Sequence, residues 1–334
     1  MPITVVGSIA YDSVKTPFGE RERMLGGAAV HFALAASFFE QVLVVGPVGE
    51  DFGEPQLEVM RRRGVDVSDI EQVAGGKTFF WRGEYGWDLN SRETLDTQLG
   101  VFEGFQPKLS ERSRASDVLF LANIVPDLQI EVREQLPDAR FVALDSMNLW
   151  IDIAKDKLVR AIESVDCLIL NDAELRQLTG KPNLVSAARE ILSWGGSAAN
   201  QPGDDEASPE EPSVPRRGPS VIVAKQGEYG AALITNESFF ALPAYPLENV
   251  IDPTGAGDTF AGGFVGYIAA HPEEELSDEL LRRAMAHGTA LASFNVEEFG
   301  TERIERLTGE EISTRVENLR EFTQFSGAPL KLRG

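Results

Sequence analysis

The chain has 334 residues, 43% of them hydrophobic, which is enough for one large α/β domain or two small ones. Its 53 acidic and 31 basic residues give a net charge of −22. This acidity argues against nucleic-acid binding, because that activity needs a basic face. It is compatible with a solvated protein surface in a high-salt cytoplasm. No run of about 18 apolar residues occurs, so the sequence predicts no membrane-spanning helix and no membrane partner.

The start of the chain and its cysteine content predict a cytoplasmic protein. The first residues lead straight into an apolar strand without a preceding basic segment, so we expect no signal peptide. The single cysteine, Cys167, lies within an apolar run, which indicates a buried structural thiol. One cysteine cannot form a disulfide within the chain.

The N-terminal region contains two candidate ligand-binding turns. Residues 3–7 predict a strand, and Asp12 follows a few residues later. The G-x-G-x-x-G fingerprint is absent, which disfavours a dinucleotide-dependent oxidoreductase. Gly26 and Gly27 precede an apolar helix, where glycines allow a close approach of the backbone to a ligand. From the residues alone, Asp12 is most simply a turn residue and His31 a packed helix residue.

A buried strand over residues 42–46 is followed by a turn and a helix that ends at Arg61–Arg63 and Gly64, an ordinary helix stop. Residues 75–105 are rich in aromatic and alternating residues, which predicts a small antiparallel sheet. Residues 75–78 read Gly-Gly-Lys-Thr, like the end of a P-loop. The first glycine of that motif is missing and no helix is predicted after it, so we exclude a P-loop.

From residue 116 onward, buried strands alternate with helical patterns, with strands at 117–122, 140–145, 166–170 and 221–224. This alternation predicts an α/β fold with a mostly parallel sheet and helices on both faces. Asn171 and Glu174 follow one of these strands, where acids in the first turn of a helix are the simplest interpretation. Residues from about 196 to 218 are rich in Pro, Ser and acids, which predicts a flexible surface insertion.

The most informative stretch is the turn before the apolar helix that starts near residue 256. Pro253 fixes the chain before the turn, and Gly255 and Gly257 allow conformations that side chains forbid. The free N–H groups at the start of that helix form an anion site. Asp258 lies in the first turn, where a carboxylate is favoured. An anion site beside a carboxylate suits phosphoryl transfer, although a capping role alone also explains Asp258.

The string Asp252-x-x-Gly255-Ala256-Gly257-Asp258-x-Phe260 resembles the C-terminal signature of the ribokinase-like (PfkB) carbohydrate kinase family. The glycine pair at 26 and 27 resembles the family's N-terminal signature, with His31 where the family usually has Asn. The resemblance runs from Gly7 to about Phe299. It implies a ribokinase-like fold over residues 1–334 as a single kinase domain, with a β lid from residues of about 12–25 and 75–105.

The resemblance implies ATP-dependent phosphorylation of a hydroxyl group on a small sugar or sugar-like molecule. Asp258 would be the base, and Gly255, Ala256 and Gly257 the anion hole. The substrate would be bound by Asp12, Gly26, Gly27 and His31. The nucleotide would lie near Asn171, Lys225, Gly227, Gly230, Thr254 and His287. Glu174 would act on Mg²⁺ through water, and Asp252, with Thr254, would be a candidate contact for a monovalent cation such as K⁺.

Several alternatives stay open at this point. The acceptor is a sugar or a nucleoside, because an aromatic lid suits a nucleoside by stacking. A non-catalytic sugar- or nucleotide-binding regulator on the same fold is the alternative from another class, although a pure binder has no need of the Asp258 carboxylate. The apolar face of the lid either excludes water from the site or forms a homodimer contact.

Overall fold

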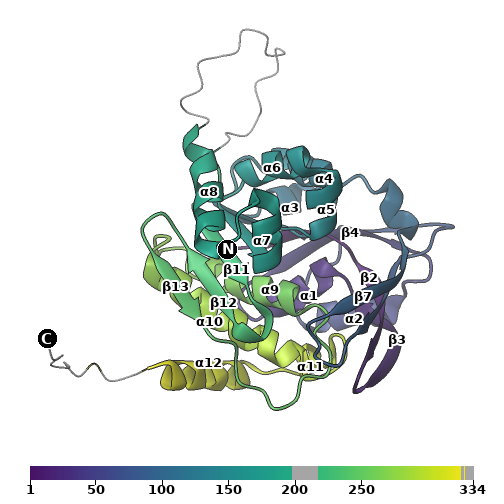
Figure 1. Ribbon diagram of the computed structural model, residues 1–334. Coiled ribbons are helices and arrows are strands. Elements are labelled where there is room, and N and C mark those ends of the chain that lie inside the picture. The colour runs from purple at the N-terminus through teal and green to yellow at the C-terminus, as the bar shows by residue number, and fades with distance from the viewer. Residues whose placement is uncertain (198–216, 325–326, 328–334) are drawn as a thin grey trace, which may run out of the picture.

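The computed structural model describes residues 1–197, 217–324 and 327. The expected acidic insertion at about 196–218 therefore lies almost entirely outside the described residues. The described chain forms two sheets, a large one between helical layers and a small one beside it (Figure 1). None of the helices among the described residues combines the length and the apolar character that crossing a bilayer requires.

Within the described residues, the larger sheet has nine strands in the order β13-β12-β11-β10-β9-β8-β1-β4-β5. The strands from β11 to β5 run parallel, and β12 and β13 are antiparallel additions at one edge. The predicted mostly parallel sheet is thus confirmed. The bounds are β1 Ile3–Val6, β4 Val42–Gly49, β5 Ile70–Val73, β8 Val118–Leu121, β9 Phe141–Asp145, β10 Cys167–Asn171, β11 Val221–Lys225, β12 Ala231–Ile234 and β13 Phe239–Leu242.

Helices cover both faces of this sheet because successive strand side chains alternate between two hydrophobic cores. Val5 packs in one core and Val6 in the other. The core that contains Val5 is completed by α1 Ala28–Ala36, α2 Glu54–Arg62, α9 Ala256–Ala269, α10 Asp278–Asn295, α11 Glu302–Glu305 and α12 Gly309–Thr323. The core that contains Val6 is completed by α4 Pro126–Gln135, α5 Asn148–Ile153, α6 Lys155–Glu163, α7 Asp172–Thr179 and α8 Leu184–Ser197, with the short α3 Glu111–Arg114 before β8.

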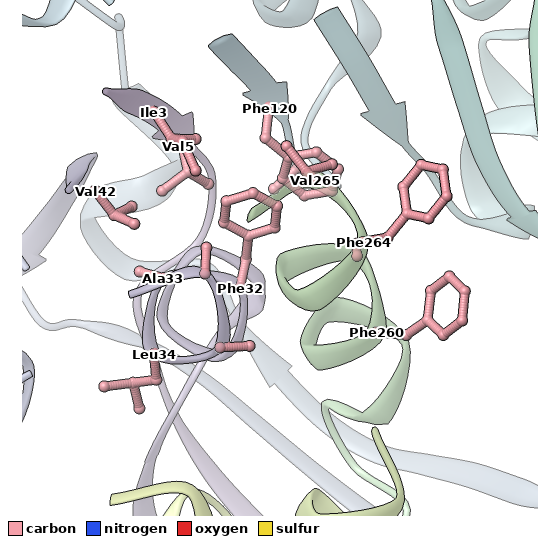
Figure 2. Packing of buried hydrophobic residues seen from close by; sticks show 14 of the residues in the cluster. Ile3, Val5, Phe32, Ala33, Leu34, Val42, Phe120, Phe260, Phe264 and Val265 are labelled. Carbon is pink, nitrogen blue, oxygen red and sulfur yellow. The ribbon is translucent and has the colours of Figure 1, made fainter. Parts of the chain in front are cut away.

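Helix α9 is packed tightly between α1 and α10. Figure 2 shows α1 and α9 side by side, with Phe32 of α1 directed at the sheet, where its ring stacks on Phe120 with centroids 4.1 Å apart. A Cβ at Gly262 would lie 2.3 Å from the Phe32 carbonyl oxygen, and one at Gly263 would lie 2.9 Å from the Cα of Gly288 in α10. Side chains at these positions would push the helices apart, so the glycines fix α9 between its neighbours.

The smaller sheet has the order β3-β2-β6-β7. Its strands are β2 Ala10–Thr16, β3 Gly19–Gly26, β6 Phe79–Tyr85 and β7 Arg92–Gln98, and residues Gly100–Gly104 form the 3₁₀ helix η1. We call this sheet the lid. The antiparallel pairing predicted for residues 75–105 is confirmed by β6 and β7, whereas β2, which lies outside that stretch, pairs with β6 in parallel. A parallel pair needs a long connection, which α1, β4, α2 and β5 supply between these strands.

One face of the lid is turned toward the large sheet. Asp12 and Trp81 are partners across β2 and β6, and Tyr85 and Arg92 are partners across β6 and β7. Residues two apart in a strand share a face, so Trp81 and Tyr85 lie on the same side as Asp12 and Arg92. The Tyr85 hydroxyl accepts a hydrogen bond from Thr254 Oγ1 at 3.3 Å, which places this face over the turn before α9.

Candidate active site

The carboxyl ends of three neighbouring parallel strands bring polar side chains together, as expected for ligand sites in such sheets. Asp145 ends β9, Asn171 ends β10 and Lys225 ends β11. The Lys225 ammonium lies 2.9 Å from Asp145 Oδ2, and both side chains are largely buried. These residues form the floor of the candidate site.

The turn before α9 has the conformation that its glycine requires. Gly255 is the N-cap of α9 with a φ of 73°, a left-handed conformation that favours glycine. A Cβ at Gly257 would lie 3.0 Å from Lys225 Nζ, so the lysine borders the first turn of the helix. The Ala256 N–H donates to the Pro253 carbonyl at 3.2 Å, so one of the three amides expected in the anion hole already has an acceptor.

Asp258 lies in the first turn of α9, partly open to the site. The pKa of its carboxyl is raised to about 7, chiefly by burial and also by the charge of Asp145, against the opposing charge of Lys225. Burial lowers the pKa of Lys225, but the carboxylates of Asp145, Glu174 and Asp258 more than offset this, so its pKa is raised. Lys225 is therefore a stable cation among acids, and Asp258 can hold or release a proton near neutral pH.

Asp12 lies on the opposite side of the site, next to the glycine pair. Its pKa is raised to about 7, chiefly by burial and also by the charges of Asp252 and Asp258, against a hydrogen bond from the Gly27 backbone that lowers it. A Cβ at Gly26 would lie 2.0 Å from Asp12 Oδ2, so only glycine leaves room for this carboxylate. Gly27 has a φ of 96°, again in the left-handed region. The structure thus brings Asp12, Gly26 and Gly27 together.

Asp252 is fully buried and its carboxylate holds two loops. Oδ1 accepts the N–H of Thr254 at 2.9 Å, and Oδ2 accepts the N–H of Gly300 at 3.0 Å. Burial raises the pKa of this carboxyl, and the hydrogen bonds partly compensate. Each carboxylate oxygen keeps acceptor capacity beyond one hydrogen bond, so the geometry fits a monovalent cation beside the turn.

Asn171 and Glu174 form a reciprocal capping box at the start of α7. Asn171 Oδ1 accepts the N–H of Glu174 at 2.8 Å, and Glu174 Oε2 accepts the N–H of Asn171 at 2.9 Å. Burial raises the pKa of the Glu174 carboxyl, and Lys225 lowers it. The described residues contain no group of three or more His, Cys, Asp or Glu side chains placed to bind a metal. Asp145 and Glu174 are acids at the carboxyl ends of adjacent strands, and such side chains suit the water-mediated contacts of a hydrated Mg²⁺, which takes most of its ligands from phosphate and water.

The glycines of the β11–β12 turn also adopt conformations that favour glycine. Gly227, the first residue of the 3₁₀ helix η2 Gly227–Tyr229, has a φ of 57°, and Gly230, directly after that helix, has a φ of 100°. Asn90, in the turn between β6 and β7, donates to Glu228 Oε1 at 3.3 Å. The tip of the lid therefore reaches across the site to the turn expected beside the nucleotide. Thr254, also expected near the nucleotide, bonds to Tyr85 of the lid as described above.

His31 and His287 occupy different surroundings. The imidazole of His31 is 2% exposed and lies against Gly255, at the centre of the site. His287 stacks on Tyr267 with ring centroids 4.1 Å apart, near the far end of α9 from Asp258. The structure does not bring His287 to the other site residues, because its position on α10 faces the C-terminal turns of α1 and α9.

Some residues at the site were not anticipated from the sequence. Asp145 had a recognisable signal, since it is an acid at the carboxyl end of a buried strand. Tyr85 and Asn295 had none, because their contacts with Thr254 depend on tertiary packing. Arg92 is a lid cation whose charge lowers the pKa of Asp12, Asp258 and Glu174. Arg92 is the cross-strand partner of Tyr85 on the face of the lid turned toward the site, which explains its effect on these three carboxyls.

Comparison with known proteins identifies the family of this chain. The model of the pfkB family carbohydrate kinases matches residues 3–306. The cytidine kinase of Thermococcus kodakarensis is 28% identical over 291 residues, which cover 85% of this chain and 95% of that protein. The match therefore extends over the lid, the strand ends and helix α9.

Solved structures agree on the fold. The nucleoside kinase of Methanocaldococcus jannaschii superposes with a TM-score of 0.70 at 19% identity and covers 95% of this chain and 98% of its own. The nucleoside kinase of Burkholderia thailandensis in complex with ADP and inosine superposes with a TM-score of 0.72 at 19% identity and covers 99% of both chains. The expected ribokinase-like α/β fold is confirmed. The chain belongs to the pfkB family of carbohydrate kinases, ATP-dependent phosphotransferases that act on an alcohol group.

Proposed function

We propose that this kinase phosphorylates a hydroxyl group on the sugar part of a small sugar or nucleoside, with Asp258 as the base. The observation that carries the proposal is that Asp258 lies near both the Lys225 ammonium and the Asp12 carboxyl. Lys225 borders the same helical turn, and Asp12 is near enough for the charge of Asp258 to raise its pKa. A hydroxyl held by Asp12 would therefore lie near the base, with cationic support for phosphate on the other side.

We assign acceptor binding, proton removal and phosphate stabilisation to separate residues of the site. Asp12 accepts hydrogen bonds from acceptor hydroxyls, with the backbone of Gly26 and Gly27 close enough to define the shape of the site. Asp258 takes the proton of the attacking hydroxyl. The amides of Gly255 and Gly257 and the Lys225 ammonium stabilise charge on the transferring phosphoryl group. Mg²⁺, when bound with ATP, neutralises phosphate charge on the side of Asn171 and Glu174. Gly227 and Gly230 shape the wall beside the nucleotide.

The nucleoside alternative is favoured by Trp81. Its ring lies along the site-facing side of β6, because a Cβ at Gly83 would lie 2.2 Å from it. Trp81 is also the cross-strand partner of Asp12. A molecule whose sugar is bound by Asp12 would thus have an indole ring within reach of an attached base. The relatives named cytidine kinase and nucleoside kinase support the same choice.

The central experiment measures ATP consumption with a panel of free sugars and nucleosides, using wild type and Asp258→Asn. We expect turnover of Asp258→Asn to fall by about 10²–10⁴-fold with the fold intact. The control is Asp156→Asn, because Asp156 is an exposed acid in the first turn of α6 and tests the capping role alone. Near-normal turnover in Asp258→Asn would exclude it as the base.

The cation and the oligomeric state are secondary proposals. Asp252 and Thr254 support a K⁺ ion beside the turn, and replacement of K⁺ by a larger organic cation should reduce turnover. Exposed apolar side chains on and beside the lid support a homodimer, and they are Phe18, Trp87, Leu95 and Leu99. Sedimentation of wild type and Leu95→Lys tests this, and two monomeric samples would rule it out.

A further inference from the structure

His31 is held in a buried hydrogen-bond network beneath the turn that precedes α9. Its Nδ1 lies 3.2 Å from Asn295 Oδ1 at the end of α10. Asn295 Nδ2 donates to the carbonyl of Thr254 at 2.7 Å, and Asn295 Oδ1 also accepts from Thr259 Oγ1 at 3.0 Å. Asn295 is fully buried. The network therefore links α1 and α10 to both sides of Gly255.

The contacts of Asn295 determine the tautomer of His31. Since its Nδ2 donates to a carbonyl, its Oδ1 must be the atom that accepts from Thr259 and His31. His31 Nδ1 therefore carries the proton, and Nε2 is an acceptor. Among the described residues, Nε2 is buried without a hydrogen-bond partner. Burial lowers the pKa of His31 to about 4, against the opposing effect of the Asn295 bond, so the ring is neutral at physiological pH.

The ring of His31 also contacts Gly255 directly. A Cβ at Gly255 would lie 2.4 Å from Nδ1, Cε1 and Nε2 of His31 alike, so Gly255 packs against the face of the ring. The imidazole thus packs against Gly255, while Asn295 Nδ2 holds the Thr254 carbonyl by a hydrogen bond. Loss of either contact would free the backbone segment that contains the proposed anion hole.

We propose that His31 and Asn295 are positioning residues that hold Thr254 and Gly255 in the geometry required for phosphoryl transfer. The inference rests on the proposed function, because that function makes the turn at Gly255 the binding site of the transferring phosphoryl group. His31 follows Gly27 by one helical turn, with its N–H bonded to the Gly27 carbonyl at 3.2 Å. The same helix therefore connects the acceptor site with the phosphate-binding turn, and His31 acts on the transfer step through Gly255.

Two variants separate packing from hydrogen bonding. His31→Phe keeps a ring against Gly255 but removes the N–H donor, and Asn295→Asp keeps the acceptor but removes the donor to Thr254. The matched control is His271→Phe, since His271 also packs on a helix, α9, and its Nδ1 also faces a carbonyl, that of Tyr267 at 2.7 Å. We expect kcat to fall about 10- to 100-fold in both test variants, with the KM of the acceptor changed little. The control should keep its kcat.

The double variant His31→Phe with Asn295→Asp should lose little more than the more impaired single variant, because both act through one network. Losses that multiply would overturn the proposal, as would an unchanged kcat. A large rise in the acceptor KM with kcat intact would instead make His31 a direct substrate contact. If Asp258→Asn keeps its activity, the proposed function fails, and that result is distinct from these.

Nitrogen NMR of wild type tests the network by a signal that does not depend on turnover. The chain has three histidines, so three pairs of ring-nitrogen signals are expected. The pair that His31→Phe removes, or that remains after assignment of the other two, should show a neutral ring protonated on Nδ1 down to about pH 5. Protonation on Nε2, or a charged ring above that pH, would overturn the assignment.

Discussion

The Lys225 ammonium lies 2.9 Å from the Asp145 carboxylate and borders Gly257 in the first turn of α9. The same cation thus lies beside the end of β9 and the first turn of α9. The position has an electrostatic consequence, because the carboxylates of Glu174 and Asp258 also act on Lys225. Its removal would leave three acids close together without this compensation.

Lys225→Gln should lower kcat/KM by about 10²-fold and raise the pKa of Asp258 further, since the charge of Lys225 now lowers it. The acid limb of the pH–rate profile should therefore move to higher pH. The control is Lys157→Gln, which removes a Lys–Asp pair of 2.5 Å on the surface. A profile that keeps its midpoint in Lys225→Gln would contradict the assigned electrostatics.

The pH dependence of wild type follows from two carboxyls whose pKa is raised to about 7, those of Asp12 and Asp258. Asp258 must be ionised to take a proton, and Asp12 must be ionised to accept hydrogen bonds from two hydroxyls at full strength. We therefore expect kcat/KM to rise with pH up to about 7, with a slope between one and two on the acid side. Asp12→Asn should reduce the slope to one at lower activity. Activity that is constant from pH 5.5 to 8 would rule this out.

The same shifts predict how stability changes with pH. A carboxyl with a raised pKa binds its proton more tightly in the folded state, so its contribution to stability is present at low pH and lost as pH rises through about 7. Asp258→Asn should therefore melt at an equal or higher temperature than wild type at pH 8, with the difference smaller at pH 5. Thermal melting at both values measures this. A lower melting temperature at pH 8 would show that Asp258 stabilises the fold.

Arg92 is expected to act on the phosphates from the lid. It faces Tyr85 across the strand pair and acts on Asp12, Asp258 and Glu174, so Arg92→Gln should lower kcat by about 10²-fold. The control is Arg82→Gln, because Arg82 lies in the same lid but pairs with Glu20 at 2.8 Å on the other face. Equal activity of the two variants would remove Arg92 from the site.

Gly255 should not tolerate even a methyl group. Gly255→Ala combines a left-handed backbone with a contact of 2.4 Å to the His31 ring. Gly64→Ala is the control for backbone strain alone, since Gly64 has a φ of 75° and no neighbour within 4 Å of an added Cβ. Gly64→Ala should cost about 1 kcal/mol of folding free energy. Gly255→Ala should cost more and abolish activity, and chemical denaturation with an activity assay measures both.

The parallel sheet and its strand ends could be predicted because apolar runs alternate with helical patterns and turn residues. The turn at Gly255 was predictable because its conformation is local and demands glycine. The parallel pairing of β2 with β6 was not, since strand direction depends on long connections. The surroundings of His31 and His287 were also beyond the sequence, because two histidines in similar apolar helices differ only in which neighbours fold against them.

The base and the lid residues lie in separate layers of the molecule, so the acceptor preference of this kinase can change without changes around the base. Helix α9 is locked by glycines against α1 and α10, so mutations there would disturb the base and the phosphate-binding turn together. The lid carries Trp81 and Arg92 on strands that are largely independent of that helical layer. Directed evolution of new acceptor preferences should therefore succeed most readily in libraries confined to the lid, with α9 left unchanged.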